Sequence, residues 1–345
     1  MFIRFSLLQL ELEESEKGGH AQMGKDIFNL PVLIIGYSRT NEIRENILKL
    51  RSFGTDKIFL SLDYADNPQI RAKQEELIEF LRTRIPNPEE LAIWHKKRNH
   101  GIAASVVSGI DWFFANCDRG IVLEDDLEFG SDFLYFCNIG LKEFESNKEI
   151  LMLSGNRFVD DKRNPKAGVC GYPQIWGWAT WRVKWQTMKK LILEDYVFQV
   201  SDLVHPNKAF FYAGAKRAQL GFVDTWDLPL AYGMLRSNYY CVIPPRNLVS
   251  NIGADAHASH TKEMSFPMGY PVSKFHKVEI PSLPQLMESA RENNYFLEKM
   301  VFRVKRRHVL SPLKMFFEMW FRPKLRKYDK LKDRIIKAER YEFKI

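Results

Sequence analysis

The chain has 345 residues and a mass of 40.5 kDa, with a formal charge of +8 and a pI near 9.1. Apolar residues make up 45% of it and aromatic residues 13%, which is enough for a folded core and excludes a disordered or collagen-like chain. The length fits one large α/β domain with an appendage or two modest domains, because a single core stops growing at roughly 250–300 residues.

The positive charge is concentrated near the C-terminus. Residues 301–345 hold 15 Lys/Arg against 5 Asp/Glu, whereas residues 1–300 hold 36 against 38. A nucleic-acid-binding fold would carry its basic residues on the fold itself, and its affinity would fall steeply with salt. We therefore expect no nucleic-acid partner. A nucleic-acid-binding protein that uses the basic residues of 301–345 is a minor alternative.

The chain shows no sign of a membrane span or a secretory signal. No stretch approaches the roughly 20 apolar residues that a span needs, and no signal-peptide pattern opens the sequence, so we expect a cytoplasmic protein. Residues 1–28 are polar after Leu12 and are expected to form a flexible leader, with translation starting at Met1 or Met23. The four cysteines are far apart and contain no C-x-x-C pair, which predicts buried thiols.

Apolar runs in the first half alternate with helical periods. The runs at residues 32–36, 57–62, 91–94, 120–123 and 150–154 predict buried parallel strands. Helical spacing is seen in Ile43, Ile47 and Leu50, and again around residues 70–81 and 106–114. This alternation predicts an α/β fold with a Rossmann-like, mostly parallel sheet flanked by helices, whose ligands bind beyond the carboxyl ends of the strands.

The second half is less periodic. Residues 160–262 are rich in Trp, Gly and Pro and are expected to form long loops over a site, with one more strand within them at 239–243. The expected domain boundaries are 29–265 for the α/β domain and 266–345 for a helical, basic C-terminal region.

The sharpest local signal is an acidic cluster in the segment GIVLEDDLEF. A hydrophobic strand at 120–123 runs directly into Glu124, Asp125 and Asp126. In an extended chain Glu124 and Asp126 share a face, so their carboxylates can converge on a cation. Hard oxygen ligands of this kind suit Mg²⁺ or Mn²⁺. The alternative is a solvated turn or a helix N-terminus, where acids are also favoured.

Four other segments hold candidate residues. Asp63 ends the second strand, where its carboxylate can accept from a base or ribose or cap a turn. WHKKRNHG, which contains Lys97 and Asn99, is a cationic turn into a helix, where a diphosphate can bind; a solvated basic loop is the alternative. GFVDTWDLPL places two acids beside aromatic rings as candidates for a general base or a helix cap. NLVSNIGADAHASHT carries His257 and His260 in a Gly- and Ser-containing loop.

Taken together and in their order along the chain, these segments resemble the GT-A nucleotide-sugar transferases. The resemblance is greatest to N-acetylglucosaminyltransferase I and its bacterial surface-polysaccharide relatives. The resemblance spans residues 31–261. It rests on six stretches: PVLIIGYSRT, NHGIAASVVSGIDWFF, GIVLEDDLEFGSDFL, ILMLSGNRF, IWGWATWRVKW and NLVSNIGADAHASHT. It implies a GT-A fold and transfer of a sugar from a nucleoside diphosphate.

The resemblance also implies roles for the acids and for their neighbours on the donor side. It makes Asp126 and His260 the residues at the metal, Asp125 a ribose contact, and Glu124 a contact of the sugar or ribose. It also places Arg39 beside the nucleotide and Asp63 by the uracil. From the cationic turn, Lys97 and Asn99 are further candidates for binding the nucleotide sugar, with Lys97 near the diphosphate.

On the acceptor side, the resemblance implies that Asp227 is the catalytic base. The family often has two adjacent acids there, whereas Leu228 follows Asp227 in this chain, so Asp224 remains an alternative. The loop containing Trp176, Gly177 and Trp178 is expected to shape the acceptor or sugar pocket.

Together these features predict an inverting glycosyltransferase that uses Mn²⁺ or Mg²⁺ and a UDP-sugar to glycosylate a hydroxyl of a glycan or lipid-linked acceptor, in surface polysaccharide or glycan synthesis. The alternative is a nucleotidyltransferase or another metal-dependent phosphoryl enzyme, which would release pyrophosphate. The basic, aromatic tail predicts peripheral binding to an anionic membrane at its inner face, or else docking of the aromatic residues on the enzyme.

Overall fold

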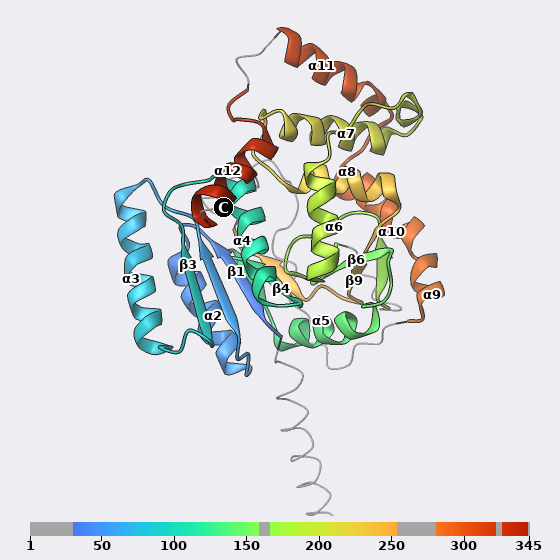
Figure 1. Ribbon diagram of the computed structural model, residues 1–345. Coiled ribbons are helices and arrows are strands. Elements are labelled where there is room, and N and C mark those ends of the chain that lie inside the picture. The colour runs from blue at the N-terminus through green and yellow to red at the C-terminus, as the bar shows by residue number, and fades with distance from the viewer. Residues whose placement is uncertain (1–29, 159–165, 254–280, 322–325, 344–345) are drawn as a thin grey trace, which may run out of the picture.

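A computed structural model of the protein describes residues 30–158, 166–253, 281–321 and 326–343 (Figure 1). Within these residues, eight strands form one mixed sheet in the order β3-β2-β1-β4-β8-β6-β9-β7. The strands are β1 (Val32–Gly36), β2 (Ile58–Leu62), β3 (Leu91–His95), β4 (Arg119–Glu124), β6 (Ile150–Ser154), β7 (Gly168–Cys170), β8 (Trp178–Trp181) and β9 (Tyr240–Ile243). The predicted α/β fold class, a mostly parallel sheet flanked by helices, is confirmed.

Every strand expected from an apolar run is present, and its ends differ from the expected ones by no more than one residue. β1 pairs in parallel with β2 and β4, β2 with β3, and β6 with β9. Their carboxyl ends therefore meet at one edge of the sheet, which is where ligands bind in folds of this kind.

The expectation that residues 160–262 are mainly long loops is wrong for the described part of that segment. β8 lies inside the sheet and runs antiparallel to both β4 and β6, and β7 pairs antiparallel with β9. Three helices also come from this segment: α6 (Arg182–Leu193), α7 (Pro206–Gln219) and α8 (Asp227–Ser237). The strands are only three or four residues long and buried on both faces, so they show no alternation of apolar and polar residues.

Helices cover both faces of the sheet. Neighbouring residues of a strand point to opposite faces, so Leu33 and Ile35 belong to one buried cluster and Val32 and Ile34 to the other. The first cluster packs under α4 (Ile102–Asn116), α6 and α8, and the second under α2 (Thr40–Ser52), α3 (Pro68–Arg84) and α5 (Ser131–Glu143). Burying each large aliphatic side chain contributes roughly 1.5–3 kcal/mol.

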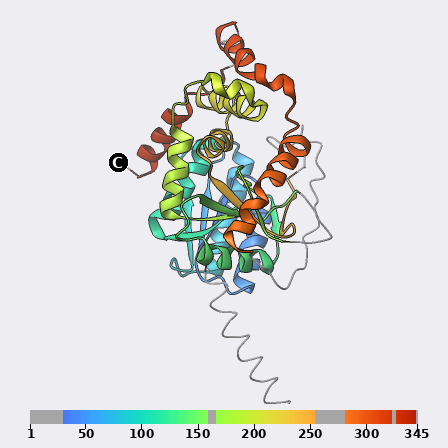
Figure 2. The ribbon, with the colours of Figure 1, turned by 90° about the vertical axis from the view of Figure 1, so that its right-hand side faces the viewer.

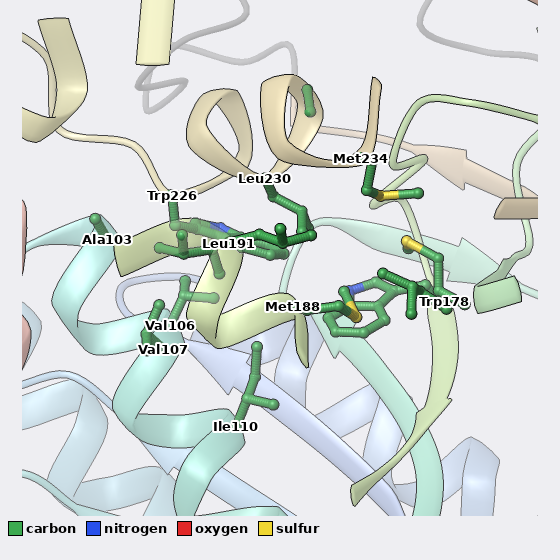
Figure 3. Close-up of a cluster of buried hydrophobic side chains, with 14 of the residues drawn as sticks. Ala103, Val106, Val107, Ile110, Trp178, Met188, Leu191, Trp226, Leu230 and Met234 are labelled. Carbon is green, nitrogen blue, oxygen red and sulfur yellow. The ribbon is translucent and has the colours of Figure 1, made fainter. Parts of the chain in front are cut away.

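Two tryptophans anchor the face on which α4 and α8 lie (Figure 3). Trp178 of β8 and Trp226, which directly precedes α8, stack with ring centroids 6.0 Å apart. Both side chains are buried, so the start of α8 is held against the core.

The C-terminal region is helical, as expected, over its described residues. It contains α9 (Leu283–Glu288), α10 (Ala290–Phe296), η3 (Leu297–Val301), η4 (Arg306–Leu310), α11 (Ser311–Phe321) and α12 (Leu331–Phe343). α10 meets the edge of the sheet, where Asn293 donates to the carbonyl of Val169 over 2.9 Å. α12 packs on α4, and α11 packs on α7 at one end of the molecule (Figures 1 and 2).

The cysteine expectation is confirmed, since all four cysteines are buried free thiols. Among the helices that the structure describes, none is long and apolar enough to cross a bilayer. The expected leader at 1–28 lies outside the described residues, and the domain boundaries remain predictions.

Candidate active site

A pocket of about 720 Å³ opens at the carboxyl ends of the parallel strands. The loop after β1, the end of β2, the end of β4 and the start of α8 all contribute to its wall. Their lining residues include Tyr37, Ser38, Arg39, Asp63, Glu124, Asp125, Asp126 and Asp227. The structure thus brings together candidates that the sequence spreads over almost 200 positions.

The acidic cluster forms a tight turn between two strands. β4 ends at Glu124, the next two residues make the turn, and the chain continues as β5 (Leu127–Phe129). Asp125 is fixed from both sides: its Oδ2 accepts from the backbone N–H of Tyr37 over 2.9 Å, and its Oδ1 accepts from Arg39 Nη1 over 3.3 Å. The same Nη1 lies 3.8 Å from Oδ2 of Asp126. Arg39 therefore bridges the two neighbouring carboxylates.

Burial and mutual repulsion govern the electrostatics of this turn. Burial raises the pKa of Asp125 to about 6, against the lowering effects of the Tyr37 N–H and the Arg39 charge. Burial also raises the pKa of Glu124 well above its usual range, with further contributions from the charges of Asp126, Asp125 and Asp227. The Asp227 carboxylate, from a different part of the chain, therefore lies close enough to act on this cluster.

The pocket lining is rich in acids. Among the described residues that line it, six are acids, and Arg39 is the single Lys or Arg. A nucleoside diphosphate is itself an anion, so binding it here requires additional positive charge. A divalent cation is the usual source of that charge at such sites.

The donor chemistry fits Mg²⁺ or Mn²⁺. The atoms at the turn are hard carboxylate oxygens, and these ions typically take one or two carboxylates and complete their shell with water and substrate phosphates. Over the ranges that the structure describes, no group of three or more His, Cys, Asp or Glu side chains is arranged as a metal cage. Glu124 and Asp126 are side chains of the turn that could hold such an ion, with phosphate oxygens as further ligands.

The chain segment before the predicted histidine loop approaches this turn closely. β10 (Val249–Asn251) pairs antiparallel with β5, and the Gly253 carbonyl accepts from Arg39 Nη2 over 3.4 Å. A Cβ atom at Gly253 would lie 2.4 Å from Oδ2 of Asp126, so the contact requires glycine. His257 and His260 follow this segment but lie outside the described residues, and the role of His260 at the metal remains a prediction.

The structure separates the two candidates for the base. Oδ1 and Oδ2 of Asp224 accept from the backbone N–H groups of Ala103 and Ile102, each over 3.0 Å. Oδ1 also receives Arg334 Nη2 of α12 at 2.7 Å. Asp224 thus caps α4 within a buried ion pair, and both of its oxygens are already bonded.

Asp227 is the first residue of α8 and is placed differently. Its Oδ1 accepts from the hydroxyl of Thr225 and, over 2.9 Å, from the N–H of Leu228, and it lines the pocket. Because Trp226 is buried beside it, the backbone at Asp227 is held in place. Asp227 is therefore the better positioned of the two acids to meet a substrate.

The cationic turn before α4 was expected to bind a diphosphate at the start of the helix, and the structure shows a different arrangement. Two N–H groups at the start of α4 donate to Asp224, so an acid of the chain itself occupies the place expected for a diphosphate. Lys97 is exposed and does not line the pocket, whereas Asn99 lines it and accepts from the N–H of Gly101 over 2.9 Å. The buried cation is instead Lys96, whose Nζ donates to the Ser105 carbonyl over 2.7 Å.

Asp63 lies at the pocket wall, and its contact with the uracil remains a prediction. Both of its carboxylate oxygens lie 3.2 Å from the N–H of His100, which donates to them. Burial raises the pKa of Asp63 to about 6, and the nearby charge of Lys96 opposes this effect. A carboxylate on this wall can accept a hydrogen bond from a ligand as well as hold the turn.

The three residues of the tryptophan loop have different positions. Trp176 lines the pocket and meets Phe158 edge to face with centroids 5.1 Å apart. Gly177 has φ +60° and allows the turn into β8. The expectation that Trp178 shapes the pocket is wrong, because its side chain is 0% exposed and packs in the core against Trp185. Trp176 precedes β8, and the turn at Gly177 separates it from the strand, so the two side chains need not share a face.

Several pocket residues were missed by the sequence analysis. Val301, Phe302 and Tyr328 come from the C-terminal region, which carried no signal for a site. Asn156 and Gln174 form a buried polar pair in the wall, with Asn156 Nδ2 donating to Gln174 Oε1 over 3.2 Å. Asn156 lies in a segment that supported the resemblance, whereas no pattern pointed to Gln174.

No protein-family model matches the chain, and no curated protein matches it. Solved structures show limited likeness. GalNAc-T7 with UDP, GalNAc and Mn²⁺ is 9% identical, with a TM-score of 0.43, over 86% of this chain and 57% of that one. HddC from Yersinia pseudotuberculosis is 13% identical, with a TM-score of 0.28, over 49% and 80% of the two chains. 4-diphosphocytidyl-2C-methyl-D-erythritol synthase from Anaerococcus prevotii is 14% identical, with a TM-score of 0.30, over 51% and 82%. The functional proposal therefore rests on the chain's own residues.

Proposed function

We propose that the protein is a metal-dependent, inverting glycosyltransferase that moves a sugar from a UDP-sugar to a hydroxyl of a glycan or lipid-linked acceptor. The observation that carries this proposal is the convergence of the acidic turn after β4 and Asp227 on one pocket, with Arg39 as the single Lys or Arg among its described lining residues. A pocket this rich in acids suits a donor that arrives with a divalent cation.

The donor would lie along the carboxyl ends of the strands. Asp63 would accept from the uracil ring, Asp125 from the ribose hydroxyls, and Asn99 would lie near the nucleotide. Arg39 holds Asp125 in place and borders the same wall. When bound, Mn²⁺ or Mg²⁺ on Glu124 and Asp126 would stabilise the negative charge that develops on the leaving diphosphate.

Asp227 would act as the general base. It takes the proton from the acceptor hydroxyl while the hydroxyl oxygen attacks the anomeric carbon from the face opposite the diphosphate. The bond from that carbon to the phosphate oxygen breaks, the new glycosidic bond forms, and the configuration inverts in a single step. The second acid, Asp224, is bound to α4 and Arg334 and has no part in this step.

A screen of UDP-sugars for Mn²⁺-dependent hydrolysis tests the proposal, because a transferase commonly hydrolyses its own donor slowly when no acceptor is present. We expect one or a few donors to release UDP, and Asp126→Ala to abolish that release. No release from any nucleotide sugar would refute the proposal. Release of pyrophosphate from a nucleoside triphosphate and a sugar phosphate would instead identify a nucleotidyltransferase.

A further inference from the structure

α11 has two apolar faces, and one of them is uncovered. Pro312 and Met315 are buried where the helix packs on α7. On the other side Leu313, Phe317 and Trp320 are 62%, 55% and 81% exposed, and Phe321 is exposed as well. These four residues follow the i, i+4, i+7, i+8 spacing, so they form a single stripe directed away from the protein. We call this stripe the α11 outer face.

Exposed cations come from α11 and from η4, the short helix that contacts it. Arg306 and Arg307 of η4 and Lys314 of α11 are exposed. The only acid in the α11 sequence, Glu318, is turned toward the protein, where it forms an ion pair with Arg217 of α7. The outward side of this helix therefore combines large apolar side chains with positive charge and presents no acid.

The position of α11 leaves this face accessible. α11 lies at one end of the molecule, with α7 between it and the sheet (Figures 1 and 2). The chain enters the α11 segment after Phe302 and leaves it before Tyr328, and both of these residues line the pocket. A surface bound by α11 would thus be connected to the pocket by short stretches of chain at both ends.

The size of the face argues against a stable protein interface. An 11-residue helix is about 16 Å long and about 10 Å wide, so its footprint is roughly 160 Å². Specific protein interfaces bury about 800 Å² on each partner. A bilayer imposes no such minimum, and its interface favours a tryptophan with aromatic and leucine neighbours beside Lys and Arg.

We propose that the α11 outer face docks on an anionic lipid bilayer, with Trp320, Phe317 and Phe321 inserted at the level of the headgroups and the flanking Arg and Lys residues against lipid phosphates. This would hold the pocket at the inner face of a membrane, where a lipid-linked acceptor is found. The docking itself does not depend on the proposed sugar transfer, because it uses no residue of the acidic turn.

The test is co-sedimentation of the full chain with vesicles of phosphatidylcholine containing about 30 mol% phosphatidylglycerol, without donor or metal. The test variant carries Phe317→Ser, Trp320→Ser and Phe321→Ser. The control variant carries Phe80→Ser, Val183→Ser and Tyr295→Ser, which remove three exposed apolar side chains from α3, α6 and α10. Because all six side chains are exposed, we expect both variants to keep the circular dichroism spectrum of the unchanged protein.

We expect the unchanged protein and the control variant to bind, and the test variant to bind at least about tenfold more weakly. Pure phosphatidylcholine vesicles and high salt should each reduce binding, because both remove the attraction to anionic headgroups. Equal binding by the test and control variants would overturn the proposal, as would failure of the unchanged protein to bind. A dimer in light scattering that only the test variant dissociates would assign the face to a second copy of the chain instead.

Discussion

The buried ion pair between Asp224 and Arg334 joins α12 to the start of α4, and we expect it to contribute strongly to stability. Only 8% of the Asp224 side chain and 11% of the Arg334 side chain are exposed, and their atoms lie 2.7 Å apart. Asp224→Ala removes both cap bonds to α4, at about 1–2 kcal/mol, and leaves the guanidinium without its carboxylate, at about 2–3 kcal/mol. We expect the free energy of unfolding to fall by about 3–5 kcal/mol.

Arg334→Met should cost less, about 2–3 kcal/mol, because Asp224 keeps its bonds to the N–H groups of Ile102 and Ala103. Urea unfolding followed by tryptophan fluorescence, carried out on both single variants and the double variant, gives the coupling energy between the two side chains. We expect a coupling of at least about 1.5 kcal/mol.

The matched control is the exposed ion pair of Lys337 and Asp329 in the same region, with its atoms 2.9 Å apart and both side chains 62% exposed. Its coupling should be indistinguishable from zero, because water and salt screen exposed pairs. A coupling below about 0.5 kcal/mol for Asp224 and Arg334 would refute our view that their burial gives the pair its strength.

Substitutions at the site, a change of pH and removal of metal should each have a measurable effect. Asp227→Asn should abolish transfer to an acceptor with little change in the thermal unfolding temperature, whereas Asp224→Asn should retain transfer wherever it stays folded; the reverse pattern would make Asp224 the base. Gly101→Ala should destabilise by about 1–3 kcal/mol in urea unfolding, because Gly101 has φ +74° and a Cβ there would lie 2.7 Å from Oδ2 of Asp224; an unchanged midpoint would contradict the described turn. Asp63 has a pKa raised to about 6, so the folded chain holds its proton more tightly than the unfolded chain, and its stabilising contribution is present below about pH 4 and lost as the pH rises through 6. Relative to the unchanged protein, Asp63→Asn should therefore gain up to about 3 kcal/mol of stability between pH 4 and pH 7, and a pH-independent difference would show that burial does not raise this pKa. Treatment with EDTA should stop donor hydrolysis and Mn²⁺ should restore it; full activity after chelation would rule out the metal.

The parallel half of the fold and the acidic turn could be predicted from the amino-acid sequence alone. The strands there are five or six residues long and mostly apolar, and amphipathic helices separate them, so local pattern and burial agree. Glu124, Asp125 and Asp126 could be located for the same reason, since an apolar strand that ends in three acids leaves little doubt about where those acids lie in a parallel sheet. The exposed aromatic residues of α11 were also visible as a basic, apolar segment, although the sequence left their packing open.

Features that depend on contacts between distant segments could not be predicted from local sequence. β8 is four residues long and its insertion between β4 and β6 depends on both neighbours, so no local pattern could reveal it. The same holds for the two tryptophans next to β8. Trp178 lies within β8 and is buried in the core, whereas Trp176, two residues earlier, lines the pocket. Asp224 and Asp227 look alike in sequence, and they differ only because α12 brings Arg334 to the first while the second is left facing the pocket.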